Sequence, residues 1–263
     1  MAYYANHQTL PPLGALCLDY TDDIHRPPGD VIESSSYEFP VIKHCVKGAN
    51  LWRIVNPDLF TDDFLQLFVD ACQILKEKGC IGIITSCGFL AQVQSRLASK
   101  IELPITTSSL IQIPFVLTCI SPNKKIGLLT FDDTVLNKVH FNGVGITEMQ
   151  MNRIVVRGCP HDGILHDIIV RGKPYIHEKL EKELLNMADL IIKENPDVVA
   201  FVLECTQMPP FAKAIQNKTG LPVYDGITMV NWFYSGLYAK TIPEDPNKAA
   251  GLIERKRGTN EEK

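Results

Sequence analysis

The chain of 263 residues contains the same sequence pattern twice, and this repeat constrains its fold more than any other feature. An apolar run that ends in a cysteine occurs at Cys80–Cys87 and again at Val198–Cys205. At the same interval after each cysteine, a leucine–proline pair opens a further short apolar run, at Pro104 and at Pro222. We therefore expect the two segments to derive from one ancestral sequence.

A third matching pair lies upstream, where Leu13–Asp19 resembles Ile126–Asp132. Three matches in the same order indicate an internal duplication of about 115 residues, which is too long for the unit of a solenoid. The duplication predicts two similar lobes.

Short apolar runs alternate with longer amphipathic segments, a pattern that is typical of parallel βαβ units. The expected strands are Leu13–Asp19, Cys80–Thr85, Pro104–Thr106, Lys125–Thr130, Ile154–Val156 and Val198–Leu203. The expected helices are Asp62–Lys78 (with Thr61 as N-cap), Phe89–Lys100, Asp133–Asn142 and Pro174–Glu194. The predicted fold class is α/β, with two pseudosymmetric lobes, each a parallel sheet flanked by helices, and the active site in the cleft between them.

The predicted lobe boundaries follow the repeat. We expect residues 1–120 together with 226–263 to form the first lobe and residues 121–225 to form the second. The chain then crosses between the lobes twice, and the crossings form a hinge that lets the lobes close on a substrate and exclude water.

The composition points to a small-molecule enzyme in a reducing compartment. The net charge is −4 and no long block of like charges occurs, so neither nucleic acid nor a membrane surface is an expected partner. No apolar run reaches the ~18–20 residues that span a bilayer, and Met1–Pro12 resembles no signal peptide. The eight cysteines are irregularly spaced, which favours free thiols and a cytoplasmic location. A homo-oligomer is compatible with the sequence.

Cys87 and Cys205 follow equivalent strands and precede expected helix starts. Ligands of open parallel sheets bind outside the carboxyl ends of the strands. Amide groups at a helix start stabilise a thiolate, so we expect at least one thiol with a pKa below the usual value of about 8.5. Two thiols on opposite sides of a carbon atom form an acid–base pair, as a racemase requires. The other six cysteines are expected to be packing residues.

The segments Thr85–Phe89 and Leu203–Pro210 resemble the paired cysteine motifs of the aspartate/glutamate/hydantoin racemase superfamily. The resemblance extends over residues 13–238. It implies catalysis without pyridoxal phosphate or another cofactor, and it makes Cys87 and Cys205 the two acid–base residues. The implied function is an isomerase: a racemase or epimerase acting next to a carboxylate or carbonyl of an amino acid or derivative. A decarboxylase or cis–trans isomerase that uses one cysteine is the alternative within the superfamily.

The chain departs from the amino-acid racemases of this superfamily at three places. Gly88 and Phe89 replace the usual Asn-Thr pair, Gln207 replaces a histidine of glutamate racemases, and Tyr20 follows Asp19 where the family has serine. These differences predict an atypical branch with a different substrate.

Hydroxyl groups are expected to bind a substrate carboxylate. Thr107 and Ser108 lie at the end of a short strand before a helix, where exposed amides also bind anions. Thr206, directly after Cys205, holds the corresponding place in the second lobe.

Charged side chains occur on the same rim. Arg26 lies in a Pro- and Gly-rich loop and can pair with an anion, while Asp19 can orient an amino group or the thiols. The remaining expected substrate-binding residues are the neighbours of the two cysteines, Ser86, Gly88 and Gln207.

The sequence gives little support to a metal site or to a thiol hydrolase. Cys159, His161 and His166 are too few ligands for a metal site, so none is predicted. A thiol hydrolase needs a histidine base, and no histidine lies in the strand-end motifs. A non-catalytic small-molecule binding protein stays an alternative.

Overall fold

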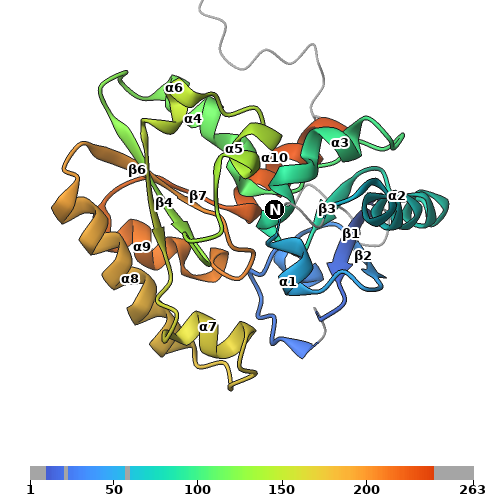
Figure 1. Cartoon of the computed structure of the whole chain (residues 1–263), viewed down its shortest axis with the longest axis horizontal. Helices are drawn as coiled ribbons and strands as arrows, with labels where there is room; N and C mark the ends of the chain where they lie inside the picture. The colour runs from blue at the N-terminus through green and yellow to red at the C-terminus, as the bar shows by residue number, and fades with distance from the viewer. Residues whose placement is uncertain (1–9, 21–22, 57–59, 240–263) are drawn as a thin grey trace, which may run out of the picture.

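The structure, a computed structural model, describes residues 10–20, 23–56 and 60–239. Two parallel sheets lie side by side in Figure 1. The first has the order β2-β1-β3, with bounds β1 Leu13–Leu18, β2 Val41–Val46 and β3 Ile83–Thr85. The second has the order β5-β4-β6-β7, with bounds β4 Lys125–Thr130, β5 Ile154–Gly158, β6 Val198–Leu203 and β7 Val223–Tyr224.

The two sheets share one topology. Strands β1 and β4 are the equivalent central strands, and each is followed by its outer neighbour (β2 or β5) and then its inner one (β3 or β6). A parallel bridge between Ile83 and Ile105 occupies the place that β7 holds in the second sheet. The predicted α/β class with two similar lobes is confirmed.

Helices cover both sheets. The α-helices are α1 Leu51–Ile54, α2 Asp62–Glu77, α3 Gln94–Ala98, α4 Ile113–Cys119, α5 Lys138–Gly143, α6 Glu148–Met151, α7 Ile164–Ile169, α8 His177–Glu194, α9 Ala212–Thr219 and α10 Gly226–Leu237. The 3₁₀ helices are η3 Ser34–Ser36, η5 Gly88–Val93, η6 Ser109–Gln112 and η7 Pro209–Phe211.

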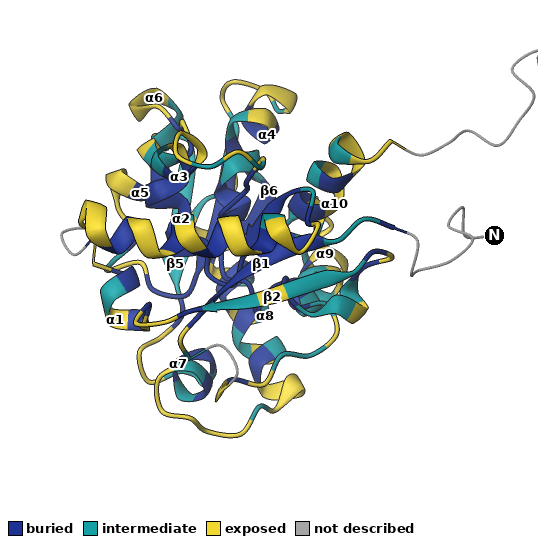
Figure 2. Ribbon diagram, turned by 90° about the vertical axis from the view of Figure 1, so that its right-hand side faces the viewer, coloured by how far each residue is buried: buried dark blue, intermediate teal, exposed yellow. Residues whose placement is uncertain are grey.

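Helix α2 illustrates how the sequence fixes an element. The hydroxyl of Thr61 accepts a hydrogen bond from the amide of Phe64, as expected for an N-cap. Phe64, Phe68, Cys72 and Leu75 recur along one face and are buried against the first sheet. In Figure 2 the outer face of α2 is exposed and its inner face is buried.

Helix α10 packs on the first sheet, although it follows the second sheet in the chain. Its residues Met229, Val230 and Tyr234 share a buried cluster with Leu13 and Ile84 of β1 and β3. This packing supports the proposed lobe division, which stays a prediction. Residues 1–9 and 240–263 of that prediction lie outside the described residues.

Several predicted elements differ in extent. The predicted helix Phe89–Lys100 is a 3₁₀ helix followed by the short α3. The buried side-chain amides of Gln92 and Gln94 donate to the carbonyls of Ile54 and Ile105, which lie outside this segment. The predicted strand Pro104–Thr106 is reduced to a single bridge. Helix α5 begins after Asn137, whose side chain caps it, rather than at Asp133.

Strand β2 was not predicted because its residues lack an apolar run. Lys43 and His44 lie in its centre, and only Val46 is fully buried. All eight cysteines lie in the described part of the chain and are free thiols. Within residues 10–20, 23–56 and 60–239, no helix combines the length and apolarity needed to cross a bilayer.

Candidate active site

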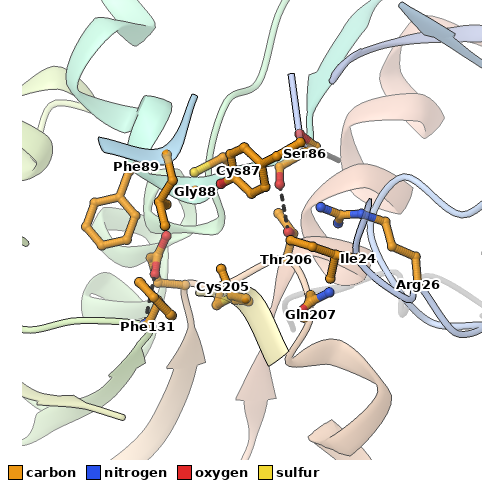
Figure 3. Close-up of a pocket in the computed structure, with 14 residues that line it drawn as sticks. Ile24, Arg26, Ser86, Cys87, Gly88, Phe89, Phe131, Cys205, Thr206 and Gln207 are labelled. Carbon is orange, nitrogen blue, oxygen red and sulfur yellow. Dashed lines mark hydrogen bonds between the residues drawn. The ribbon is translucent and has the colours of Figure 1, made fainter. Parts of the chain in front are cut away.

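A cavity lies between the two lobes, at the carboxyl ends of the central strands (Figure 3). The first lobe contributes Tyr20, Ile24, Arg26, Leu51, Ser86, Cys87, Gly88 and Phe89, and the second contributes Phe131, Ile169, Glu204, Cys205, Thr206 and Gln207. Its volume is about 30 Å³, which is room for about one water molecule. The cavity is therefore closed around its lining side chains.

Both predicted catalytic cysteines line this cavity. Cys87 follows β3 and precedes η5, and Cys205 follows β6, so equivalent strand ends position the two thiols. Each of the two cysteines is 8% exposed. The amide of Phe89 donates to the sulfur of Cys87, and the amide of Gln207 donates to that of Cys205.

The expected lowering of a thiol pKa is wrong for this closed cavity. Burial raises the pKa of Cys87 to about 12, with a further increase from the nearby Glu204 carboxylate. Burial and Glu204 also raise the pKa of Cys205 well above its usual value. The two amide hydrogen bonds act in the predicted direction, but the loss of hydration outweighs them.

Glu204 is a site residue that the sequence analysis missed. It is 2% exposed, and its Oε2 accepts hydrogen bonds from the Thr130 hydroxyl (2.8 Å) and the Phe131 amide (3.4 Å). Burial raises the pKa of Glu204 to about 7, against those two hydrogen bonds. Its position before Cys205 was visible in the sequence, but nothing there showed that an acidic side chain would turn inward.

Gly88 allows this carboxylate to approach the first cysteine motif. A Cβ atom at Gly88 would lie 2.2 Å from Oε1 of Glu204 and 2.5 Å from its backbone oxygen. The side chain of Glu204 from one lobe therefore fits only because position 88 of the other lobe has none.

Arg26 supplies positive charge on the opposite side of the cavity from Phe89 and Phe131 (Figure 3). Its guanidinium forms an ion pair with Asp30 at 2.9 Å, and the side chains are 9% and 0% exposed. Arg26 thus lies at the cavity, and its pairing with a substrate anion stays a prediction.

Tyr20 is a second residue that the sequence analysis missed as a site component. It lines the cavity, and burial raises its pKa well above the usual value. The sequence showed Tyr20 only as a departure from a family motif.

The polar neighbours of the cysteines lie at the cavity as predicted. The Thr206 hydroxyl donates to the Ser86 carbonyl at 2.9 Å and so connects the lobes. The amide nitrogen of Gln207 donates to the His25 carbonyl, whereas its Oε1 is buried without a hydrogen-bond partner among the described residues.

Three predicted substrate-binding residues do not line the cavity. Asp19 lies at the surface, where its carboxylate accepts from Lys47 and from the Gly48 amide. The Thr107 hydroxyl donates to Gln94, and the Ser108 hydroxyl caps η6. The polar groups of all three side chains are engaged by the protein itself.

A wider surface groove adjoins the cavity. It has a volume of about 290 Å³ and includes Asn50, Trp52 and Gly172. Four residues line both spaces, namely Tyr20, Ile24, Leu51 and Ile169. These shared side chains separate the thiols from solvent.

The sequence of the chain is similar to those of known lyases. No family model matches it. A dimethylsulfoniopropionate lyase of Durusdinium sp. clade D is 32% identical over 228 residues, covering 85% of this chain and 74% of that protein. Dimethylsulfoniopropionate lyase 3 of Emiliania huxleyi is 29% identical over 234 residues, covering 86% of this chain and 60% of the relative.

Solved structures share the fold. Allantoin racemase from Klebsiella pneumoniae has a TM-score of 0.59 at 12% identity, covering 92% of this chain and 97% of that one. Unliganded arylmalonate decarboxylase has a TM-score of 0.56 at 14% identity, covering 90% and 96%. The chain belongs to the family of the dimethylsulfoniopropionate lyases, and it shares the fold of racemases and decarboxylases that the cysteine motifs resemble.

Proposed function

We propose that this protein is a carbon–sulfur lyase that acts on dimethylsulfoniopropionate or a similar zwitterion. The observation that carries the proposal is the charge distribution around the two thiols. Arg26 lies on one side of Cys87 and Cys205, while Glu204, Phe89 and Phe131 lie on the other. A cavity of this kind fits a small molecule with an anionic end and a cationic end.

The two ends of the substrate match the two sides of the cavity. A carboxylate joins Asp30 as a second partner of the Arg26 guanidinium. A sulfonium group is attracted by the Glu204 carboxylate and by the faces of aromatic rings, which Phe89 and Phe131 supply. The carbon next to the carboxylate then lies between the sulfurs of Cys87 and Cys205.

The reaction is a β-elimination. A thiolate removes a proton from the carbon next to the carboxylate, and that electron pair forms a double bond to the neighbouring carbon. The bond from this second carbon to sulfur breaks, and its electrons leave with the sulfur as neutral dimethyl sulfide. Acrylate is the other product, and the thiol now carries the proton, which it loses to solvent when the next substrate binds.

The raised thiol pKa values fit this scheme. In the empty cavity both thiols are neutral, because burial and Glu204 disfavour the thiolate. A bound sulfonium places positive charge beside the sulfur and stabilises the thiolate. The base is thus generated only when the substrate is bound. Because the closed cavity holds about 30 Å³, the side chains shared with the groove have to move for a substrate to bind.

Single-cysteine variants test the proposal. An elimination needs one base, so we expect either Cys87→Ala or Cys205→Ala to lose at least about 10³-fold in the rate of dimethyl sulfide release. The other variant should keep measurable turnover. Cys119→Ala, an exposed thiol, is the matched control and should keep full activity. If both site variants release dimethyl sulfide at the wild-type rate, the thiols are not the base.

Racemisation of an amino acid or hydantoin is the second candidate. Two observations favour it: the cysteines occupy equivalent places in the two lobes, and the buried Oε1 of Gln207 can accept a hydrogen bond from a substrate N–H group. Dimethylsulfoniopropionate has no such donor. A one-cysteine decarboxylase of 2-substituted malonates is the related alternative.

Deuterium exchange separates these reactions. For a racemase, both alanine variants should lose racemisation, while each still exchanges the α-hydrogen of one enantiomer with D₂O, and the two variants should prefer opposite enantiomers. A decarboxylase would instead release carbon dioxide from a malonate and need only one cysteine. Absence of exchange with any amino acid or hydantoin, together with dimethyl sulfide release, would exclude the second candidate.

A further inference from the structure

Three side chains with metal-binding groups converge outside the cavity, on the second lobe. Asp132 follows β4, His161 follows β5, and His166 lies in α7. Their ligating atoms all lie within 4.8 Å of one another. The distance between Nε2 of His161 and Oδ1 of Asp132 is 3.6 Å. The carboxylate of Asp132 supplies the ligand that the pair of histidines lacked in the sequence.

Two of the three side chains are held in place by the fold. Asp132 is 8% exposed, and its Oδ1 accepts from the amide and the hydroxyl of Thr134 at 2.9 and 2.6 Å. His166 is 5% exposed, and its Nε2 lies 3.1 Å from the Phe131 carbonyl. Hydrogen bonds of this kind orient the ligands of protein metal sites.

The third ligand is accessible. The side chain of His161 is 65% exposed, so it can rotate towards the other two and gives an ion a route from solvent. Atoms that each lie ~2.0–2.2 Å from one ion are about 3.3–3.6 Å apart in a tetrahedral site. The distance between His161 and Asp132 already meets this requirement.

We propose that Asp132, His161 and His166 bind a divalent transition-metal ion, with Zn²⁺ the best match. Two imidazoles and one carboxylate suit this ion, and three protein ligands leave one position for water. Arg171 lies beside this group: it donates to the His161 carbonyl and pairs with Asp167, which offsets its charge.

The site is separate from the thiol chemistry. None of its three ligands lines the cavity among the described residues. It adjoins the cavity wall, because Phe131 stacks on His166 at 4.2 Å between ring centroids and Ile169 of the same helix lines the cavity. A bound ion would therefore connect the ends of β4 and β5 to α7 and stabilise this wall, without taking part in bond breaking.

Binding of Zn²⁺ alone tests the proposal on the full chain, first stripped of metal with a chelator. Calorimetric titration should give one ion per chain, and a Zn²⁺ excess of about 100-fold over Kd should raise Tm by about 5 °C or more. Co²⁺ in place of Zn²⁺ should give the visible absorption of a site with nitrogen and oxygen ligands.

The variants decide whether the three residues are the ligands. His161→Ala alters an exposed side chain and should fold normally, and it should weaken Zn²⁺ binding at least 10-fold, as should Asp132→Asn. His177→Ala is the matched control: His177 also lies 3.6 Å from a carboxylate, that of Glu181, in an exposed pair on α8. Saturable binding that survives in His161→Ala, depends on Cys87 or Cys205, or does not occur at all would overturn the proposal.

Discussion

At the scale of single residues, Glu204 determines the electrostatics of the site. Its carboxyl group is buried between the two cysteine motifs, and its negative charge raises the pKa of Cys87 and of Cys205. A buried acid of this kind is poised to change its charge near neutral pH, because burial raises its own pKa to about 7 from the ordinary 4.5.

The pH dependence of stability should reveal this carboxyl group. Since the pKa of Glu204 is higher in the folded state, the folded protein takes up the proton first. Its contribution to stability is complete below pH ~4.5 and is lost as the pH rises through about 7. Glu204→Gln removes this dependence. We therefore expect the free energy of unfolding of the wild type, minus that of the variant, to decrease between these two values in denaturant titrations.

Glu148→Gln serves as the control for this measurement. Glu148 is exposed and its pKa is lowered by Lys138, so the sign of its contribution is opposite. The same decrease in both variants would show that the effect does not come from a buried acid.

The sequence placed both predicted catalytic cysteines at the cavity but only part of their surroundings. Cys87 and Cys205 were found because a duplicated pattern marks equivalent strand ends, and chain topology brings such ends together. Glu204 and Tyr20 were missed, since the inward turn of a polar side chain depends on contacts with the other lobe. Asp19 lies outside the cavity, because Lys47 and Gly48, distant in the sequence, bind its carboxylate.

At the scale of elements, the start of η5 controls how closely the two motifs approach. Gly88→Ala would place a methyl group against Glu204. We expect at least about a 10-fold loss of kcat/KM and a loss of ~1–3 kcal/mol in stability, because the loop that carries Cys87 has to shift. Steady-state kinetics and chemical denaturation measure the two effects.

Gly236→Ala is the matched control, because a Cβ atom at Gly236 of α10 meets nothing within 4 Å. Alanine has the higher helix propensity, so this variant should be as active as the wild type and slightly more stable. Equal activity of the variants at positions 88 and 236 would show that a methyl group at position 88 does not clash with Glu204.

Elements that bury a regular apolar face were predicted well. Helix α2 and strands β4 and β6 lie where periodicity and capping placed them. The elements without such a face were not. Strand β2 is half-exposed, and the segment after Cys87 forms a 3₁₀ helix whose geometry depends on contacts between lobes.

At the scale of the whole molecule, hydrogen bonds between the lobes hold the cavity closed. The Thr206 hydroxyl donates to the Ser86 carbonyl, and the Ser109 hydroxyl donates to the Leu203 carbonyl at 2.6 Å. Both bonds are buried. The first connects the two cysteine motifs, and the second connects the start of η6 to the end of β6.

Thr206→Val tests this connection. The buried carbonyl of Ser86 loses its donor, which should cost about 1–3 kcal/mol of stability. KM should rise because the closed form that binds the substrate is less populated. Thr206→Ser keeps the hydroxyl and should behave like the wild type. An unchanged Tm and KM for the valine variant would mean that Thr206 only fills space.

The raised thiol pKa values have a consequence for the lifetime of the enzyme. Acrylate, a product of the proposed reaction, is an electrophile that alkylates thiolates by conjugate addition. A site with permanently ionised cysteines would be inactivated by its own product. Because Cys87 and Cys205 are neutral whenever no cation is bound, they are poor nucleophiles at the moment when acrylate is still nearby. The burial that keeps these thiols protonated in the empty cavity thus also protects them from alkylation by the product.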